Sequence, residues 1–255
     1  MRYLKGAIAL SATKDLPLLR HVMYTKYVTQ MQLWQFMRHS EGEWSRGSFW
    51  WRIKRLADHG FVVRHLVPMV HGDVVLTIAA PGIVYLVESF GTPYSGPDSG
   101  PEVRPDGAGV AHALGVNDVH LGFLRAGCLT SWENEMEIRC RNELPVSKYA
   151  KEYDAIITLR LGGRQIRFAL EYERSPKARS EYDAISAMLD RETNLDRVLY
   201  LAGTHHIRTV LAQHFTRRRQ RVFIALATDL PFTAPSELEV LDTLTKQTFP
   251  LNDIP

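Results

Sequence analysis

Three acidic residues, Asp154, Glu171 and Glu173, are the residues of this chain whose spacing points most directly to chemistry. They belong to a segment, residues 153–173, in which two stretches of strand-like composition are separated only by the glycine pair at 162–163. A two-residue glycine loop is typical of a tight antiparallel hairpin. We therefore expect the hairpin to gather the three carboxyl groups at its open end.

The register of this hairpin decides how the carboxyl groups meet. When Leu161 faces Arg164, counting back along both strands puts Asp154 opposite Glu171, and alternation puts Glu173 on the same face as Glu171. Like charges directly opposite each other destabilise a strand pair, so three carboxylates need a cation, a shared proton or wide exposure to water. A divalent metal held by hard oxygen ligands is the functional interpretation, and a solvated acidic hairpin end is the structural alternative.

The composition limits the class of protein. Of 255 residues, 45% are hydrophobic and 23% are charged, which is ordinary for a globular protein of one large domain or two small ones. The two cysteines, Cys128 and Cys140, lack metal-site spacing, and free thiols favour a reducing cytoplasm. The sequence contains neither a signal-peptide core nor a long apolar run, so we expect a cytoplasmic protein without a membrane-spanning segment.

Charge and composition also divide the chain. Residues 1–90 carry eleven Lys and Arg against six Asp and Glu, which points to a polyanionic partner for this part. Residues 91–110 are rich in Gly, Pro and Ser, and they predict a flexible linker. We therefore expect two domains, residues 1–90 and residues 111–255, on either side of that linker.

The expected order of elements in residues 1–90 is three helices, a hairpin and a further helix. Asp15 is expected to cap the first helix, and the third helix is expected at about 45–59. Strands are expected at 61–67 and 74–78. Three helices followed by a two-stranded ribbon is the order of a winged helix, a variant of the helix-turn-helix.

The third helix carries the argument for DNA. Its apolar residues Phe49, Ile53 and Leu56 fall on one face and should pack inward, which leaves basic side chains and a Trp for the opposite face. Basic side chains neutralise phosphates, Arg reads guanine edges, and an exposed Trp stacks or packs on sugar. The residues predicted to contact double-stranded DNA are Arg46, Trp51, Arg52, Lys54 and Arg55 around this helix, with Arg64 and His71 on the ribbon. The alternatives are a winged helix that contacts proteins and a charged face that is merely solvated.

From residue 111 onward the pattern is α/β. Besides the hairpin we expect helices at 112–126, 180–191 and 206–215 and strands at 198–201 and 222–226. Residues 132–141 fit a strand or a helix. Alternation of strand and helix after the hairpin predicts a mixed sheet with helices on both faces. The fold class predicted for the whole chain is thus α+β.

Several short segments carry a family resemblance. They are residues 81–86, 112–118, 132–135, 153–155 and 170–174. Through them the chain resembles the replication-relaxation family, proteins of plasmids and other mobile elements. The resemblance implies a role in plasmid replication or DNA relaxation, and it defines no reaction.

The second half is also similar to the PD-(D/E)XK nuclease fold, also called restriction-endonuclease-like. In that fold an acid on an early helix, an Asp that opens a strand and an acid-X-lysine on the next strand hold magnesium. The resemblance implies that Asp154 is the Asp, that Glu171 is the following acid, and that Glu135, or alternatively Glu133, is the early acid. The implied ligands of Mg²⁺ are Glu135, Asp154 and Glu171.

Glu173 departs from the nuclease pattern because it stands where the pattern has lysine. Lys177 can supply the positive charge from the following segment, and Lys148 or Lys151 can supply it from before the hairpin. With such a substitute the domain is a metal-dependent DNA endonuclease or nickase, and without one it is a silent relative that grips DNA or partners. The predicted catalytic residues are Asp154, Glu171, Glu173 and Lys177.

Three functions remain open at this point. The first is a DNA-binding nickase of a mobile element, the second a non-catalytic winged-helix transcriptional regulator, and the third an assembly factor that recruits replication or conjugation proteins. Many winged helices dimerise, so a homodimer is compatible with the sequence, although no heptad stripe says where the copies would meet.

Overall fold

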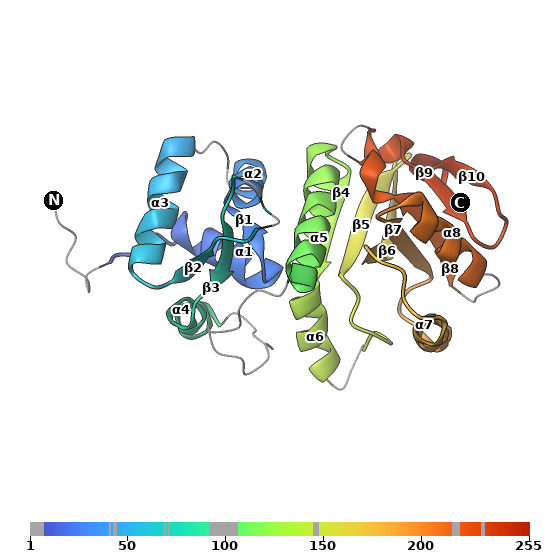
Figure 1. Cartoon of the computed structure of the whole chain (residues 1–255), viewed down its shortest axis with the longest axis horizontal. Helices are drawn as coiled ribbons and strands as arrows, with labels where there is room; N and C mark the ends of the chain where they lie inside the picture. The colour runs from blue at the N-terminus through green and yellow to red at the C-terminus, as the bar shows by residue number, and fades with distance from the viewer. Residues whose placement is uncertain are drawn as a thin grey trace. The chain divides into compact units, whose positions relative to one another are not determined.

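The computed structural model describes residues 8–40, 42, 45–68, 70, 72–91, 107–144, 148–215, 220–230 and 233–255. Within these ranges the chain is mixed α+β, with eight α-helices and a seven-stranded mixed sheet (Figure 1). It divides into two compact units, residues 1–121 and residues 122–255. Most of the segment predicted to be a linker lies outside the described residues. No described helix is long and apolar enough to cross a membrane.

The first unit contains a small antiparallel sheet among helices. Its elements are α1 (Asp15–Thr25), β1 (Val28–Thr29), α2 (Gln30–Ser40), α3 (Arg46–Asp58), β2 (Val62–His65), β3 (Val75–Ile78), α4 (Ala80–Phe90) and most of α5 (Gly107–Arg125). The strand order is β1-β3-β2, in which Val62 pairs with Ile78 and Val28 with Leu76. The three helices and the ribbon expected from the sequence are present, and β1 adds a third strand.

Helix α3 has clear start and stop signals. The Ser45 hydroxyl caps it by accepting a hydrogen bond from the Ser48 amide at 3.2 Å. The inward positions Phe49, Ile53 and Leu56 are fully buried, as predicted. Just after the helix, Gly60 adopts a φ of +74°, a conformation that favours glycine. The opposite face of α3 is therefore directed away from the core of its unit.

The second unit is built on the large sheet. Its elements are β4 (Leu129–Asn134), α6 (Glu135–Glu143), β5 (Ala155–Leu161), β6 (Arg164–Glu173), α7 (Arg179–Arg191), β7 (Arg197–Ala202), α8 (His205–His214), β8 (Arg221–Leu226), β9 (Glu239–Asp242) and β10 (Thr248–Pro250). The strand order is β10-β9-β8-β7-β6-β5-β4, in which β6, β7 and β8 run parallel and the other neighbours run antiparallel. The undecided segment 132–141 is the end of a strand followed directly by a helix.

The β5–β6 hairpin has the predicted register. Leu161 pairs with Arg164, so the loop consists of Gly162 and Gly163 alone. These glycines adopt φ angles of +54° and +79°. Two consecutive positive φ angles suit a two-residue hairpin turn and are readily adopted only by glycine. The glycine pair thus sets the register that aligns the acidic residues.

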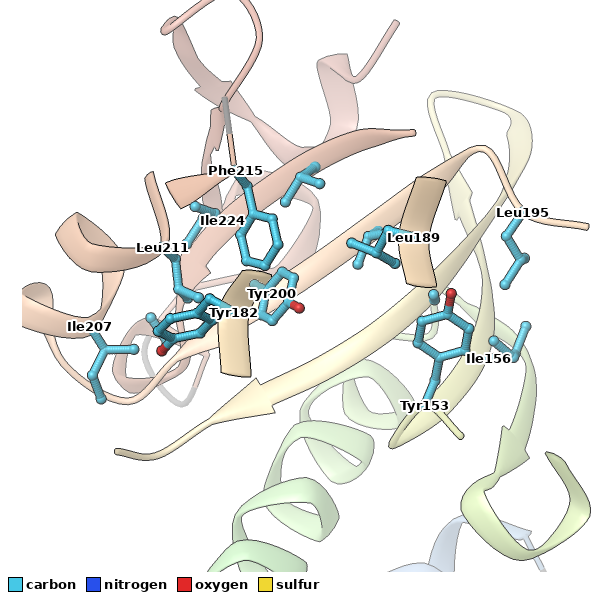
Figure 2. Close-up of a cluster of buried hydrophobic side chains, with 14 of the residues drawn as sticks. Tyr153, Ile156, Tyr182, Leu189, Leu195, Tyr200, Ile207, Leu211, Phe215 and Ile224 are labelled. Atoms are coloured by element: carbon cyan, nitrogen blue, oxygen red, sulfur yellow. The ribbon is translucent and has the colours of Figure 1, made fainter. Parts of the chain in front are cut away.

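A buried layer covers the face of the sheet from which the acidic residues project. Helices α6, α7 and α8 contribute to it, and Figure 2 shows side chains of α7 and α8 over the strands. The contributing residues include Ile138, Tyr182, Leu189, Ile207, Leu211 and Phe215 from helices or their ends, and Ile156, Tyr200 and Ile224 from strands. The Tyr200 and Phe215 rings stack, with centroids 5.0 Å apart. On this face Glu171 and Glu173 are buried, with 9% and 4% of their surface exposed.

Candidate metal site and nucleic-acid interface

The hairpin brings the predicted carboxyl groups to one end of the large sheet. The β5–β6 register, extended by one residue, sets Asp154 opposite Glu171. Asp154 Oδ2 accepts a hydrogen bond from the Tyr172 amide at 2.7 Å, which ties the residue before β5 to strand β6. Glu171 and Glu173 share one face of β6, and Glu171 pairs with Tyr200 of the parallel strand β7.

Two lysines neutralise part of this negative charge. Lys151 Nζ lies 2.5 Å from Glu171 Oε1, and only 15% and 12% of these two side chains are exposed. Lys177 Nζ forms an ion pair with Glu173 Oε2. A cation therefore stands beside the glutamate that replaces the lysine of the nuclease pattern. Lys148, the other lysine considered from the sequence, is exposed.

The electrostatics of Glu171 show that the lysines do not fully compensate the site. Burial, with a smaller contribution from the neighbouring charge of Asp154, raises the pKa of Glu171 to about 7, although Lys151 and Lys177 act to lower it. Desolvation thus outweighs an ion pair at contact distance. A site of this kind favours a further positive charge or a proton.

A buried tyrosine hydroxyl that the sequence analysis missed lies on the same face. Tyr200 is 1% exposed, and its hydroxyl has no hydrogen-bond partner within the described part of the chain. Burial raises the pKa of Tyr200 well above its usual value, and the charges of Glu171 and Glu173 add to that effect. The only sequence signal was one hydroxyl within the otherwise aliphatic strand 198–201.

The acids proposed for the early position are held by arginines. Glu135, the first residue of α6, pairs with Arg139 at 3.0 Å. Glu133 pairs with Arg141 at 2.6 Å. By register Glu133 faces Ile156, which puts it on the face of the sheet that carries Glu171. Of the two alternatives, the strand residue Glu133 is therefore the one that shares the acidic face.

The carboxylate oxygens at the end of the sheet suit a hard divalent cation, but in this structure lysine ammonium groups contact them. Asp154 and Glu171 offer carboxylate oxygens, the ligands that Mg²⁺ prefers. Lys151 occupies one oxygen of Glu171. Among the described residues, no group of three or more His, Cys, Asp and Glu is arranged to hold a metal ion. A metal ion at Glu171 therefore competes with Lys151 for that oxygen.

The predicted nucleic-acid interface on α3 is only partly exposed. Trp51 presents 52% of its surface. Lys54 is exposed and pairs with Asp58 one turn along the helix, at 2.5 Å. Arg46 is also exposed, and its guanidinium lies over the rings of Trp34 and Trp50 at 5.0 and 5.9 Å. These side chains form a basic and aromatic surface on and beside the outer face of α3.

Two of the arginines assigned to that surface are not on it. Arg52 and Arg55 bind the two carboxylate oxygens of Asp15 at 2.7 and 2.6 Å, with side chains only 17% and 12% exposed. The prediction that Arg55 lies on the outer face with Arg52 flanking it is wrong, because a fully buried carboxylate binds both guanidinium groups. Asp15 was expected to cap α1, but it is the first residue of that helix and makes no capping bond there.

The pKa of Asp15 lies below its usual value, as expected for a carboxylate with two guanidinium partners. Burial alone would raise this pKa, but the hydrogen bonds from the Ser11 amide, Arg52 and Arg55 outweigh burial and lower it. Arg55 also donates to the Ala9 carbonyl at 3.3 Å. The cluster thus joins α1, α3 and the segment before α1.

On the ribbon, Arg64 is exposed at the end of β2. His65 beside it is turned to Thr77, 2.8 Å away, and burial lowers the pKa of its imidazole. His71, which was also predicted to contact DNA, lies outside the described residues. The exposed cations that remain for a polyanion in the described part of this surface include Arg46, Lys54 and Arg64.

Comparisons with known proteins add no relative. No family model matches the chain, and neither a curated protein nor a solved structure is significantly similar to it.

Proposed function

We propose that this chain is a DNA-binding protein of a plasmid or other mobile element that nicks duplex DNA with Mg²⁺. The observation that carries the proposal is the buried acidic end of the large sheet, where Asp154 faces Glu171 and Glu173 pairs with Lys177. The pKa of Glu171 rises to about 7 although Lys151 contacts its carboxyl group. The site therefore has too little positive charge around this carboxylate. A divalent cation is the ligand that would supply it.

The role of each residue follows from the resemblance to the nuclease fold. Asp154 and Glu171 hold the metal, which when bound lowers the pKa of a water and stabilises charge on the scissile phosphate. Asp154 is already oriented by the hydrogen bond from the Tyr172 amide. Lys177 supplies, beside Glu173, the positive charge that the pattern takes from a lysine at that position.

The first unit supports the DNA-binding part of the proposal. Its order of elements, α-β-α-α-β-β with a three-stranded antiparallel sheet, supports a winged-helix assignment. In this arrangement α3 lies in the major groove with Trp51 and Lys54, and the ribbon contacts the backbone through Arg64. Arg52 and Arg55 hold the inner side of α3 through their ion pairs with Asp15. The two free cysteines fit a reducing cytoplasm.

The test is conversion of supercoiled plasmid to relaxed circles with Mg²⁺ or Mn²⁺. We expect relaxation by the wild-type protein and none by Asp154→Asn, because the amide removes a charged metal ligand. Asp190→Asn, at an exposed position of α7, is the matched control and should relax plasmid normally.

Each other result points to a different conclusion. Equal relaxation by wild type and Asp154→Asn would place the activity elsewhere or in a contaminant. Absence of relaxation together with retained DNA binding would favour the transcriptional regulator or the assembly factor for replication or conjugation.

A further inference from the structure

Lys151 differs from an ordinary surface lysine because its ammonium group contacts a buried carboxylate. It lies in the segment between α6 and β5, outside regular secondary structure. Its ammonium contacts Glu171 Oε1 at 2.5 Å and lies 5.2 Å from the centre of the Tyr153 ring. A four-carbon side chain on irregular backbone can leave such a contact by rotation of its own bonds.

Lys177 is held in another way. It lies just before α7 and pairs with Glu173, four residues earlier in the chain. Its side chain is 36% exposed, and its backbone amide donates to the Tyr182 hydroxyl at 3.2 Å. The two lysines therefore serve different carboxylates from different segments, and removing one leaves the other in place.

The charges at the site favour an exchange of ions. Asp154, Glu171 and Glu173, when ionised, outnumber the two ammonium groups by one. Exchange of the Lys151 ammonium for a divalent cation brings the same group of charges to neutrality. In a water-poor site this difference is large, because charges interact strongly where the dielectric constant is low.

Tyr200 supplies an independent sign of a ligand. Its hydroxyl is buried and makes no hydrogen bond among the described residues, and it lies on the acidic face opposite Glu171 in the strand pairing. A buried hydroxyl without a partner is costly, so a native structure rarely keeps one without a use. A hydrated cation in place of Lys151 would offer oxygen partners to this hydroxyl.

We propose that Lys151 is a displaceable counter-ion that closes the metal site when no metal is bound, whereas Lys177 stays with Glu173. This inference rests on the proposed metal-dependent function. Lys151 competes with the divalent cation for Glu171, so metal entry requires the ammonium to swing out. The site is thereby kept neutralised, and the fold intact, before metal arrives.

The first test compares Mn²⁺ binding by wild type, Lys151→Met and Lys177→Met, using calorimetry and the loss of the free Mn²⁺ signal in electron paramagnetic resonance. Methionine keeps the apolar stem and removes the charge. We expect Lys151→Met to bind Mn²⁺ about tenfold more tightly than wild type, and Lys177→Met to show no such gain. The double variant Lys151→Met/Glu171→Gln removes both charges of the pair, and it should fold without gaining affinity.

A second test uses the wild-type protein, so it does not depend on a variant that folds. Lysine acetylation is measured by mass spectrometry at limiting reagent, with and without Mg²⁺. We expect Mg²⁺ to increase the modification of Lys151 several-fold and to leave that of Lys177 unchanged.

The outcomes separate the two proposals. Mn²⁺ binding by wild type with equal or weaker binding by Lys151→Met, or a Lys151 that stays protected in Mg²⁺, overturns the counter-ion role and leaves the metal site standing. Absence of binding by wild type and by Lys151→Met overturns the counter-ion and the metal-dependent function together. Mn²⁺ binding by Lys151→Met but not by wild type supports the counter-ion role of Lys151. It also explains why the wild-type protein binds no Mn²⁺.

Discussion

Glu171 is a carboxyl group whose surroundings oppose its ionisation. Its pKa rises from 4.5 to about 7 in the folded protein, first because of burial and further because of Asp154. Between these values the folded protein binds a proton that the unfolded chain has lost. This contribution to the free energy of unfolding therefore falls as the pH rises from about 4.5 to about 7, and it is constant above that range.

We expect Glu171→Gln to remove this pH dependence, because the amide does not titrate. The part of the free energy of unfolding that varies with pH should shrink by up to about 3 kcal/mol. Urea unfolding on both sides of the interval measures it, and Glu239→Gln, an exposed change on β9, is the control that should keep the slope. An unchanged slope in Glu171→Gln would mean that another group titrates.

The hydroxyl of Tyr200 gives a second prediction for a single atom. Because it is buried and makes no hydrogen bond to any described residue, Tyr200→Phe should raise the free energy of unfolding of the metal-free protein by about 1 kcal/mol. The same change should weaken Mn²⁺ binding if the hydroxyl serves the metal site. Urea unfolding and calorimetry measure the two effects. A loss of stability in the metal-free protein would contradict the lack of a partner.

At the scale of elements, the cations of α3 have different roles, in buried ion pairs and on the exposed surface. Arg52 and Arg55 neutralise the buried carboxylate of Asp15, whereas the exposed Lys54 pairs with Asp58 on the helix surface. Breaking a buried pair leaves an uncompensated charge, while an exposed pair one turn apart contributes little. The helix is thus anchored by its inner cations, whereas its outer ones are exposed.

We expect Arg55→Met to lower the free energy of unfolding by about 3 kcal/mol or more, because Asp15 loses one of its two guanidinium partners. Lys54→Met, one residue away, is the matched control and should change stability by less than about 0.5 kcal/mol. Urea unfolding of both variants measures the difference. Similar stabilities would show that the Asp15 cluster does not hold α3.

The elements that the sequence predicted are those with strong local patterns. The apolar period of α3, its serine cap and the following glycine are contained within one segment, and so is the turn at residues 162–163. Strands β9 and β10 were missed, because they are only four and three residues long and show no strong pattern apart from their pairing with each other and with β8. Local patterns therefore sufficed for most helices and the hairpin, and failed for these two short strands.

At the scale of the whole molecule, the difference between local patterns and contacts of distant segments also explains which site residues were predicted and which were missed. The facing of Asp154 and Glu171 followed from counting along a hairpin, which is local. The capture of Arg52 and Arg55 by Asp15 joins residues about forty positions apart, and nothing in the periodicity of α3 reveals it. Tyr200 meets Glu171 only because β7 runs parallel to β6 after a helical crossover. Contacts between distant segments need the fold.

If DNA binding and metal chemistry belong to different units, they should be separable in the intact chain. Lys54→Glu combined with Arg64→Glu should weaken duplex binding and reduce the slope of log affinity against log salt by about 2, because two phosphate contacts are lost. The Mn²⁺ affinity of this variant should equal that of wild type. Asp154→Asn should show the reverse pattern, with wild-type DNA affinity and no Mn²⁺ binding.

Fluorescence anisotropy of a labelled duplex at several salt concentrations, together with Mn²⁺ calorimetry, tests both variants on the same preparations. Glu88→Gln, an exposed change on α4, controls for a general effect of altered charge in the first unit. Loss of DNA affinity in Asp154→Asn would mean that the acidic site itself binds the duplex, and full affinity in the double variant would remove α3 and the ribbon from the interface. In the expected case, the first unit determines where the protein binds and the acidic site determines what it does there.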